Sequence, residues 1–443
     1  MLDTVIVDVL ALVFWGCAIT SVFFMAMYIV FLRMHVRLRR RGREEEERLL
    51  ALAPPPDEEL PHVVVQIASY NEGFLVRRAA EAAARLEWPI DRLHIQICDD
   101  STDDTLAIAH AVAGELRGRG FDVAVLHRKV RDGFKAGSLA AGVGATPHQY
   151  FAIFDADYVP APDFLRRCMP VLLSDATLSF VQARIDYLNP DVNALTRAQV
   201  LLFDHHTGVE QTTRSWDGHA LPFNGTCGIW RRAAIEAGGG WRGDTLAEDL
   251  DLSYRAWLAG FHGVFLATVT APGELPTTFR AWASQQRRWT KGFSQIAYRM
   301  MAALFLGRIE GTRRRIVVFT HLSPALLAPV SALATVSGIA LLILRWDWAL
   351  WLFGTGLFLF YSGYGLALAG LLIAQRTLHG DRARSRHFVQ ACAQALGLRY
   401  YLDMIATYYL ARDLIARQPV EFVRTPKQHP STPHRIAGPE KAE

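Results

Sequence analysis

The sequence predicts an integral membrane protein in which an α/β domain with a mainly parallel sheet lies between membrane-spanning helices. Long apolar runs stand near both ends of the 443-residue chain. Between them, short β-rich apolar runs alternate with helical ones, the pattern of an α/β fold with a parallel sheet. Apolar residues make up 51% of the chain and charged residues 20%, which excludes a disordered or fibrous protein.

Charge and cysteine content exclude further classes. The formal net charge of +4 is too small to indicate a nucleic-acid partner. The five cysteines are scattered, with no CxxC pair and no Cys/His ligand spacing. This argues against a disulfide framework and against a structural zinc site.

The N-terminal element expected is a transmembrane helix over residues 1–33. Val9–Leu32 holds 24 uncharged residues, enough to cross a bilayer core of about 30 Å. Six arginines follow between Arg33 and Arg43, which places that end in the cytoplasm. Because the basic residues follow the apolar run, we expect a retained anchor and not a cleaved signal. Residues 34–60, rich in charge and proline, are expected to be a linker.

The α/β domain is expected over residues 61–275. The predicted strands are His62–Ser69, Leu93–Cys98, Val123–His127, Tyr150–Phe154 and Leu178–Ala183. The predicted helices are Phe74–Leu86, Thr102–Arg117 and Ala194–Glu210.

The C-terminal part returns to the membrane. Interfacial helices are expected over 276–315 and transmembrane or amphipathic helices over 316–420, with crossings at Ile316–Leu344 and Ala349–Ala374. Phe388–Leu410 carries Arg399 and Asp403 at i,i+4 spacing, which favours an interfacial or bundle-facing helix over a crossing helix or a bent hairpin. Residues 421–443 are expected to be a disordered tail.

Polar groups follow three predicted strands, where ligands bind in open α/β sheets. They are Tyr70-Asn71-Glu72, Asp99-Asp100 with the Ser101–Asp103 that follow, and Asp155 with Asp157. Each alone is explained as a helix cap, but three together indicate a site. Asp155 and Asp157 offer hard oxygen ligands suited to Mg²⁺ or Mn²⁺ and a diphosphate. The chain has neither a complete Gly-x-Gly-x-x-Gly motif nor a Walker A motif, which argues against NAD or ATP.

Two groups of polar residues later in the chain are further candidates for a functional site. Asp249 lies in Leu246–Asp251, which opens a helix running to about Ala259, and its carboxylate either caps the helix or deprotonates a sugar hydroxyl. Gln285, Arg288 and Trp289 precede the membrane segments. They form either an interfacial helix or a site where Arg holds a diphosphate and Trp stacks on a sugar.

In order and spacing, these stretches resemble family 2 glycosyltransferases of the cellulose synthase-like superfamily, above all plant mannan- and xyloglucan-backbone synthases and their bacterial relatives. The matching stretches are Ala68–Glu72, Asp99–Asp103, Gly133–Leu139, Phe154–Asp157, Val181–Arg184, Phe223–Thr226, Glu248-Asp249 and Gln285-x-x-Arg288-Trp289. Phe422–Lys427 is similar to the gating segment of these synthases, with Arg424 where Val is usual.

The resemblance implies a Rossmann-like GT-A fold and a role for each site residue. Asp99 or Asp100 contacts the base and ribose, with Asp100 also among the catalytic residues. Asp155 and Asp157 bind the divalent metal, Mg²⁺ or Mn²⁺, and the diphosphate. Asp249 is the general base. The remaining donor- and acceptor-binding residues implied are Tyr70, Asn71, Glu72, Lys135, Gln285, Arg288, Trp289, Thr425 and Lys427.

The implied activity is inverting transfer of a hexose from UDP-glucose or GDP-mannose to a growing β-glucan or β-mannan, in a processive manner. The catalytic domain is then cytoplasmic, under the inner or plasma membrane, and the partners are a nucleotide sugar, a polysaccharide or lipid acceptor and membrane lipid. The alternatives are transfer of one sugar to a lipid acceptor, and a catalytically inactive scaffold. Phe422–Lys427 is either a lid over the diphosphate or a basic tail that binds anionic lipid.

Overall fold

The structure is a computed structural model that describes residues 2–380 and 388–415. Its centre is a seven-stranded sheet in the order β3-β2-β1-β4-β6-β5-β7. The strands are β1 (Val63–Ser69), β2 (Leu93–Asp99), β3 (Asp122–His127), β4 (Tyr150–Asp155), β5 (Leu178–Tyr187), β6 (Gly228–Arg231) and β7 (His262–Gly273). All neighbours pair in parallel except β6, which is antiparallel to β4 and to β5. The expectation of a mainly parallel sheet is confirmed.

Helices cover both faces of the sheet, because successive residues of the central strands point to opposite faces and nearly all of them are apolar and buried. On one face, Val63, Val65 and Ile67 of β1 pack into the cluster that includes α2, α3 and α5. On the other, Val64 packs with α4, α8 and α9. These helices are α2 (Phe74–Ala83), α3 (Thr105–Gly118), α4 (Phe134–Gly144), α5 (Phe164–Ser174), α8 (Arg232–Ala237) and α9 (Glu248–Leu258).

Every predicted strand and helix of the domain is present, with small shifts at its ends. Helix Ala194–Glu210 is present as α6 (Ala194–His205), which continues through a π-helical turn (His206–Gln211) into α7 (Thr212–Trp216). Strands β6 and β7 were not predicted. β6 has only four residues, and β7 contains glycine and proline that break a strand pattern.

Helix α1 (Leu2–Leu50) is one continuous helix, so residues 34–50 of the expected linker are helical. Arg40 and Glu44 pair one turn apart at 2.9 Å, which supports a helix. Farther along, the Glu46 carboxylate accepts hydrogen bonds from the N–H and hydroxyl of Thr268, both at 2.8 Å. The charged stretch therefore docks α1 onto the α/β domain.

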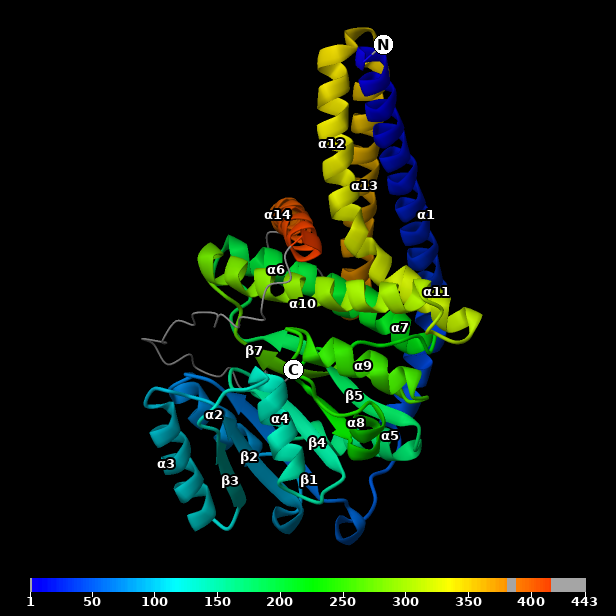
Figure 1. The fold of residues 1–443 in the computed structure, drawn as a ribbon. Helices are drawn as coiled ribbons and strands as arrows, with labels where there is room; N and C mark the ends of the chain where they lie inside the picture. Colours follow the sequence, from blue (N-terminus) through cyan, green and yellow to red (C-terminus); the bar gives the residue numbers. More distant parts are fainter. Residues whose placement is uncertain (1, 381–387, 416–443) are drawn as a thin grey trace.

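Among the residues that the structure describes, three segments are long and apolar enough to cross a membrane: Thr4–Leu50, Thr312–Leu344 and Trp346–His379. They contain α1, then α11 (Thr312–Leu322) with α12 (Leu327–Leu344), and α13 (Ala349–His379). Figure 1 shows α1, α12 and α13 running together away from the sheet. This arrangement is consistent with a membrane protein.

Between these long helices and the sheet lies a layer of crosswise helices (Figure 1). It contains α6, α10 (Phe279–Phe305) and α14 (Phe388–Ile415). Helix α14 packs against α6, α10 and α12. It is therefore the bundle-facing helix that Arg399 and Asp403 predicted, and not a hairpin.

Candidate active site

A cavity of about 1480 Å³ begins at the carboxyl edge of the sheet and continues between the long helices. Asp100, Asp155 and Asp249 line its polar end. Phe14 of α1 and Leu352 of α13 line its apolar end. One continuous space thus joins the acidic strand ends to the region of the candidate membrane spans.

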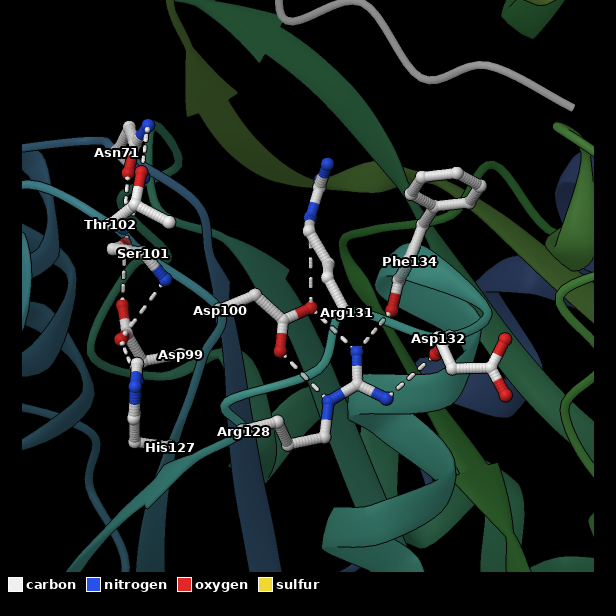
Figure 2. A network of polar contacts seen from close by, with 10 residues as sticks. All are labelled: Asn71, Asp99, Asp100, Ser101, Thr102, His127, Arg128, Arg131, Asp132 and Phe134. Atoms are coloured by element: carbon white, nitrogen blue, oxygen red, sulfur yellow. Dashed lines mark hydrogen bonds and ion pairs between the residues drawn. The ribbon is translucent and has the colours of Figure 1, made fainter.

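The two aspartates that end β2 have different environments. Asp99 is fully buried, and its carboxylate accepts hydrogen bonds from Ser101 and faces His127 at 2.8 Å, as Figure 2 shows. Asp100 lines the cavity, where Arg128 donates to both of its oxygens at 2.8 and 2.6 Å. Of the two alternatives that the sequence left open, only Asp100 lies where a ligand reaches it.

In the polar loop after β1, as at the end of β2, some residues line the cavity and others do not. Tyr70 and Glu72 line the cavity, and the guanidinium of Arg131 stacks 3.5 Å from the centre of the Tyr70 ring. Asn71 is not among the lining residues. Its side chain and that of Ser101 tie the β1 and β2 loops together, with Thr102 N–H donating to Asn71 Oδ1 at 2.8 Å. Asn71 thus links the two loops, and the donor-binding role that the resemblance implied for it stays a prediction.

The end of β4 brings acidic and basic groups together. Lys135 of α4 donates to Asp155 Oδ1 at 2.5 Å and to the carbonyl of Gly225 at 2.8 Å. Burial disfavours the charged form of Lys135, but Asp155 and Glu248 outweigh it and raise the Lys135 pKa. Asp157 also lines the cavity, and Arg78 holds its backbone carbonyl at 3.0 Å. Asp155 and Asp157 thus offer hard carboxylate oxygens on one cavity wall.

Asp249 lies in the first turn of α9, against the loop that carries Gly225. Its Oδ1 accepts the Leu250 N–H at 2.8 Å. Burial, with a further contribution from Glu248, raises the pKa of Asp249 to about 7. A carboxylate with a pKa near neutrality and a place on the cavity wall has the properties required of a general base.

The Asp249 carboxylate lies close to Gly225, where a side chain would leave too little room for it. A Cβ atom there would lie 2.9 Å from Asp249 Oδ2, and the backbone has φ of +76°. We expect Gly225→Ala to displace the carboxylate and lower kcat about 10²-fold, with stability reduced as well. Gly240→Ala is the control, because its φ is +74° with no atom within 4 Å. Equal losses of kcat in the two variants would show that backbone strain, and not contact with Asp249, is responsible.

The Asp249 pKa also predicts a pH dependence. Below about pH 7 the protonated carboxyl has no capacity to accept a proton, so kcat/KM is expected to fall about tenfold per pH unit. Above that pH the rate is expected to level off. The measurement is steady-state kcat/KM between about pH 5 and pH 8, with donor affinity measured at each pH as a control. A profile that rises toward acid would contradict the assignment.

Helix α10 adds Gln285, Arg288 and Trp289 to the cavity wall. Burial lowers the Arg288 pKa, while Asp155, Glu248, Asp157 and Glu72 act in the opposite direction. The Trp289 ring meets Phe203 edge-on at 5.7 Å between ring centres. These three residues line the same cavity as the acidic strand ends, and their roles stay predictions. Thr425 and Lys427 lie outside the described residues.

Sequence reasoning missed several polar groups at the site. Arg128 links Asp100 to the carbonyls of Asp132 and Phe134, just before Lys135 (Figure 2). In the π-helical turn, His206 bonds Glu210 at 2.9 Å. Burial would raise the pKa of Glu210, but the hydrogen bond and charge of His206 lower it. A π-turn within a helix often marks a functional site, but nothing in the local sequence reveals it.

Comparison with known proteins agrees with this geometry. The model of the family described as glycosyltransferase like family 2 matches residues 61–292, more than half of the chain. The chain belongs to glycosyltransferase family 2. The family predicted from the sequence motifs is thereby confirmed.

The relatives of this family 2 glycosyltransferase include plant proteins. Glucomannan 4-beta-mannosyltransferase 2 of Arabidopsis thaliana is 38% identical over 306 residues, 67% of this chain and 57% of that protein. Glucomannan 4-beta-mannosyltransferase 1 of Oryza sativa subsp. japonica is 37% identical over 308 residues, 67% of this chain and 59% of its own. The chain thus spans less than two thirds of the length of these relatives.

Among solved structures, the fold is similar to that of the mannosyltransferase PcManGT from Pyrobaculum calidifontis, solved in complex with GDP-Man and Mn2+. The TM-score is 0.54 at 19% identity, over 81% of this chain and 100% of that one. This similarity, together with the family match, confirms the predicted GT-A-like fold.

Proposed function

We propose that the chain is an inverting hexosyltransferase that transfers mannose from GDP-mannose to a growing β-linked glycan at a membrane. The position of Asp249 carries the proposal: a carboxyl with a pKa of about 7 lies in the same cavity as Asp155 and Arg288. Of the two donors that the sequence left open, GDP-mannose is favoured because the plant relatives are named as mannosyltransferases.

The proposed reaction needs one base and no covalent intermediate. Asp249 accepts the proton of the acceptor hydroxyl as that oxygen forms a bond to the anomeric carbon of the donor. The bond from the anomeric carbon to the diphosphate breaks, and the nucleoside diphosphate leaves with the electron pair. Direct displacement inverts the anomeric carbon, so an α-linked donor gives a β-glycoside.

The groups around the leaving diphosphate fit this reaction. Lys135 and Arg288 are cations placed close to Asp155. Asp155 and Asp157 would hold a divalent cation, Mn²⁺ or Mg²⁺, since their donor atoms are the hard oxygens that such ions prefer. When bound, that ion neutralises the charge that develops on the diphosphate.

The cavity offers the product a path from the site of transfer to the candidate membrane spans. It runs from Asp249 to Phe14, Leu342 and Leu352 in α1, α12 and α13, and Trp289 supplies an aromatic face for a sugar at the point between. A processive synthase fits this continuity, with the α/β domain on the cytoplasmic side of the inner or plasma membrane, as the arginines at the end of the first span predict. The apolar lining of the far end favours a second candidate, transfer of a single sugar to a lipid acceptor.

The test is a transfer assay with the purified, detergent-solubilised chain and radiolabelled GDP-mannose or UDP-glucose in separate reactions with Mn²⁺. We expect incorporation from GDP-mannose into a product that lengthens with time and is degraded by a β-mannanase. A product of one sugar on an extracted lipid would establish the second candidate. Incorporation from neither donor would overturn both.

We also propose, still as a prediction, that Phe422–Lys427 forms a lid over the diphosphate. Truncation after Gln418 is expected to abolish transfer while the protein remains folded and membrane-inserted. The measurement is turnover of the truncated protein in detergent, where a tail that only binds anionic lipid makes no difference. Wild-type turnover would eliminate the lid.

A further inference from the structure

Three histidines lie close together at the amino ends of three adjacent strands, at the edge of the sheet opposite the candidate active site. His94 lies in β2, His62 directly precedes β1, and His148 lies shortly before β4. Since β2, β1 and β4 are adjacent in the sheet, their amino ends form one edge. Strands of this length separate that edge from the acidic one by about 20 Å.

The ring nitrogens of these histidines converge. One ligand atom of each lies within 4.8 Å of the other two. His62 Nδ1 and His94 Nε2 are 2.8 Å apart, within hydrogen-bond distance. The His148 ring stacks on the His94 ring, with 4.0 Å between the ring centres and 18° between the ring planes. His62 is exposed and the other two are half-buried, so an ion in solution has access to the group.

A carboxylate orients the central ring. Asp122 Oδ2, on β3, lies 2.6 Å from His94 Nδ1. A hydrogen bond at that nitrogen leaves Nε2 free of its proton and directed toward His62. A carboxylate behind a histidine in this way is the usual outer partner of a metal-ligating imidazole. The row Asp122, His94, His62 and His148 follows the strand order β3-β2-β1-β4.

The three donors are all imidazole nitrogens, which are common ligands of transition metal ions. Three nitrogen donors are a better match for Zn²⁺ than for Mg²⁺ or Mn²⁺, which prefer oxygen ligands.

We propose that His62, His94 and His148 form a binding site for a divalent transition metal ion, with Zn²⁺ the best match, at the amino edge of the sheet. Nitrogens around tetrahedral zinc lie about 3.3 Å apart, so binding requires the exposed His62 ring to move by a few tenths of an ångström and the His148 ring to turn toward the ion. The ion would join three strand ends and stabilise the folded domain by preferential binding. It would be separate from the metal proposed at Asp155 and Asp157.

The test is calorimetric titration of ZnCl₂ into the untagged full chain in detergent, with excess Mg²⁺ present. We expect one zinc ion per chain. His94→Ala and His148→Ala should each weaken binding at least about tenfold, and Asp122→Asn about tenfold. His110→Ala, which removes an exposed histidine of α3, should bind zinc as the wild type does.

Two further measurements locate the ion. Zinc should raise the unfolding temperature of the wild type and of His110→Ala but not of His94→Ala. Asp157→Asn should bind zinc unchanged, because its carboxylate lies at the opposite edge. Absence of stoichiometric binding, unchanged affinity in His94→Ala, or loss of binding in Asp157→Asn would each overturn the proposal, the last by placing zinc among the active-site carboxylates.

Discussion

Replacement of Asp249 by Asn is expected to lower the rate of sugar transfer by about 10² to 10⁴ while the donor still binds. The amide keeps the size of the side chain and loses the capacity to accept a proton. Because Asp249 is assigned to the acceptor hydroxyl and not to the nucleotide, donor affinity should stay within about twofold of the wild type. Single-turnover transfer and donor titration, carried out on the same preparation, measure the two effects.

Asp251→Asn provides a matched control on the same helix. The Asp251 carboxylate is buried and pairs with Arg255 at 2.8 Å and Arg299 at 3.2 Å. Its loss should lower the unfolding temperature and leave transfer per folded molecule nearly unchanged. If Asp249→Asn instead fails to bind donor and transfers normally at saturating donor, Asp249 belongs to the donor site.

Removal of the divalent ion should have an effect of similar size. Both EDTA treatment and Asp157→Asn are expected to lower transfer at least about 10²-fold, because neutralisation of the leaving diphosphate contributes several kcal/mol to the barrier. Mn²⁺ added after EDTA should restore the wild type but not the variant. The assay is initial transfer rate against free Mn²⁺ concentration.

Asp104→Asn is the control for this substitution, since Asp104 is an exposed carboxylate at the start of α3 whose side chain makes no cap hydrogen bond. Its transfer rate and its dependence on Mn²⁺ should equal those of the wild type. Full activity in EDTA would remove the metal from the proposal while leaving Asp249 as the base.

Local sequence patterns predicted much of the fold and the site. The apolar segments that form β1 and β4 are buried on both faces. Their nearly continuous apolar sequence, alternating with helical segments, therefore predicted strands of a mainly parallel sheet. Asp100, Asp155 and Asp249 were found because polar groups at strand and helix ends are visible in the sequence. The family match confirms the resemblance that these motifs carried.

The features of the fold and the site that could not be predicted depend on contacts between residues far apart in the sequence. The different environments of Asp99 and Asp100 come from His127 and Arg128, which β3 brings alongside β2. The helical form of residues 34–50 is stabilised by docking, as the bonds from Thr268 to Glu46 show. The three histidines are likewise invisible as a group in the sequence, because His62, His94 and His148 are far apart along the chain and meet only through the strand order.

The anomeric configuration of the product shows whether the acceptor oxygen, with Asp249 as its base, displaces the diphosphate directly at the anomeric carbon. NMR of the glycan formed from GDP-mannose labelled with ¹³C at the anomeric carbon reports that configuration through its one-bond carbon–proton coupling. We expect a β-mannosyl linkage in the wild type, and the same linkage formed about 10² to 10⁴ times more slowly with Asp249→Asn. An α-linked product from the wild type, or a β-linked product formed at the wild-type rate by the variant, would contradict this mechanism.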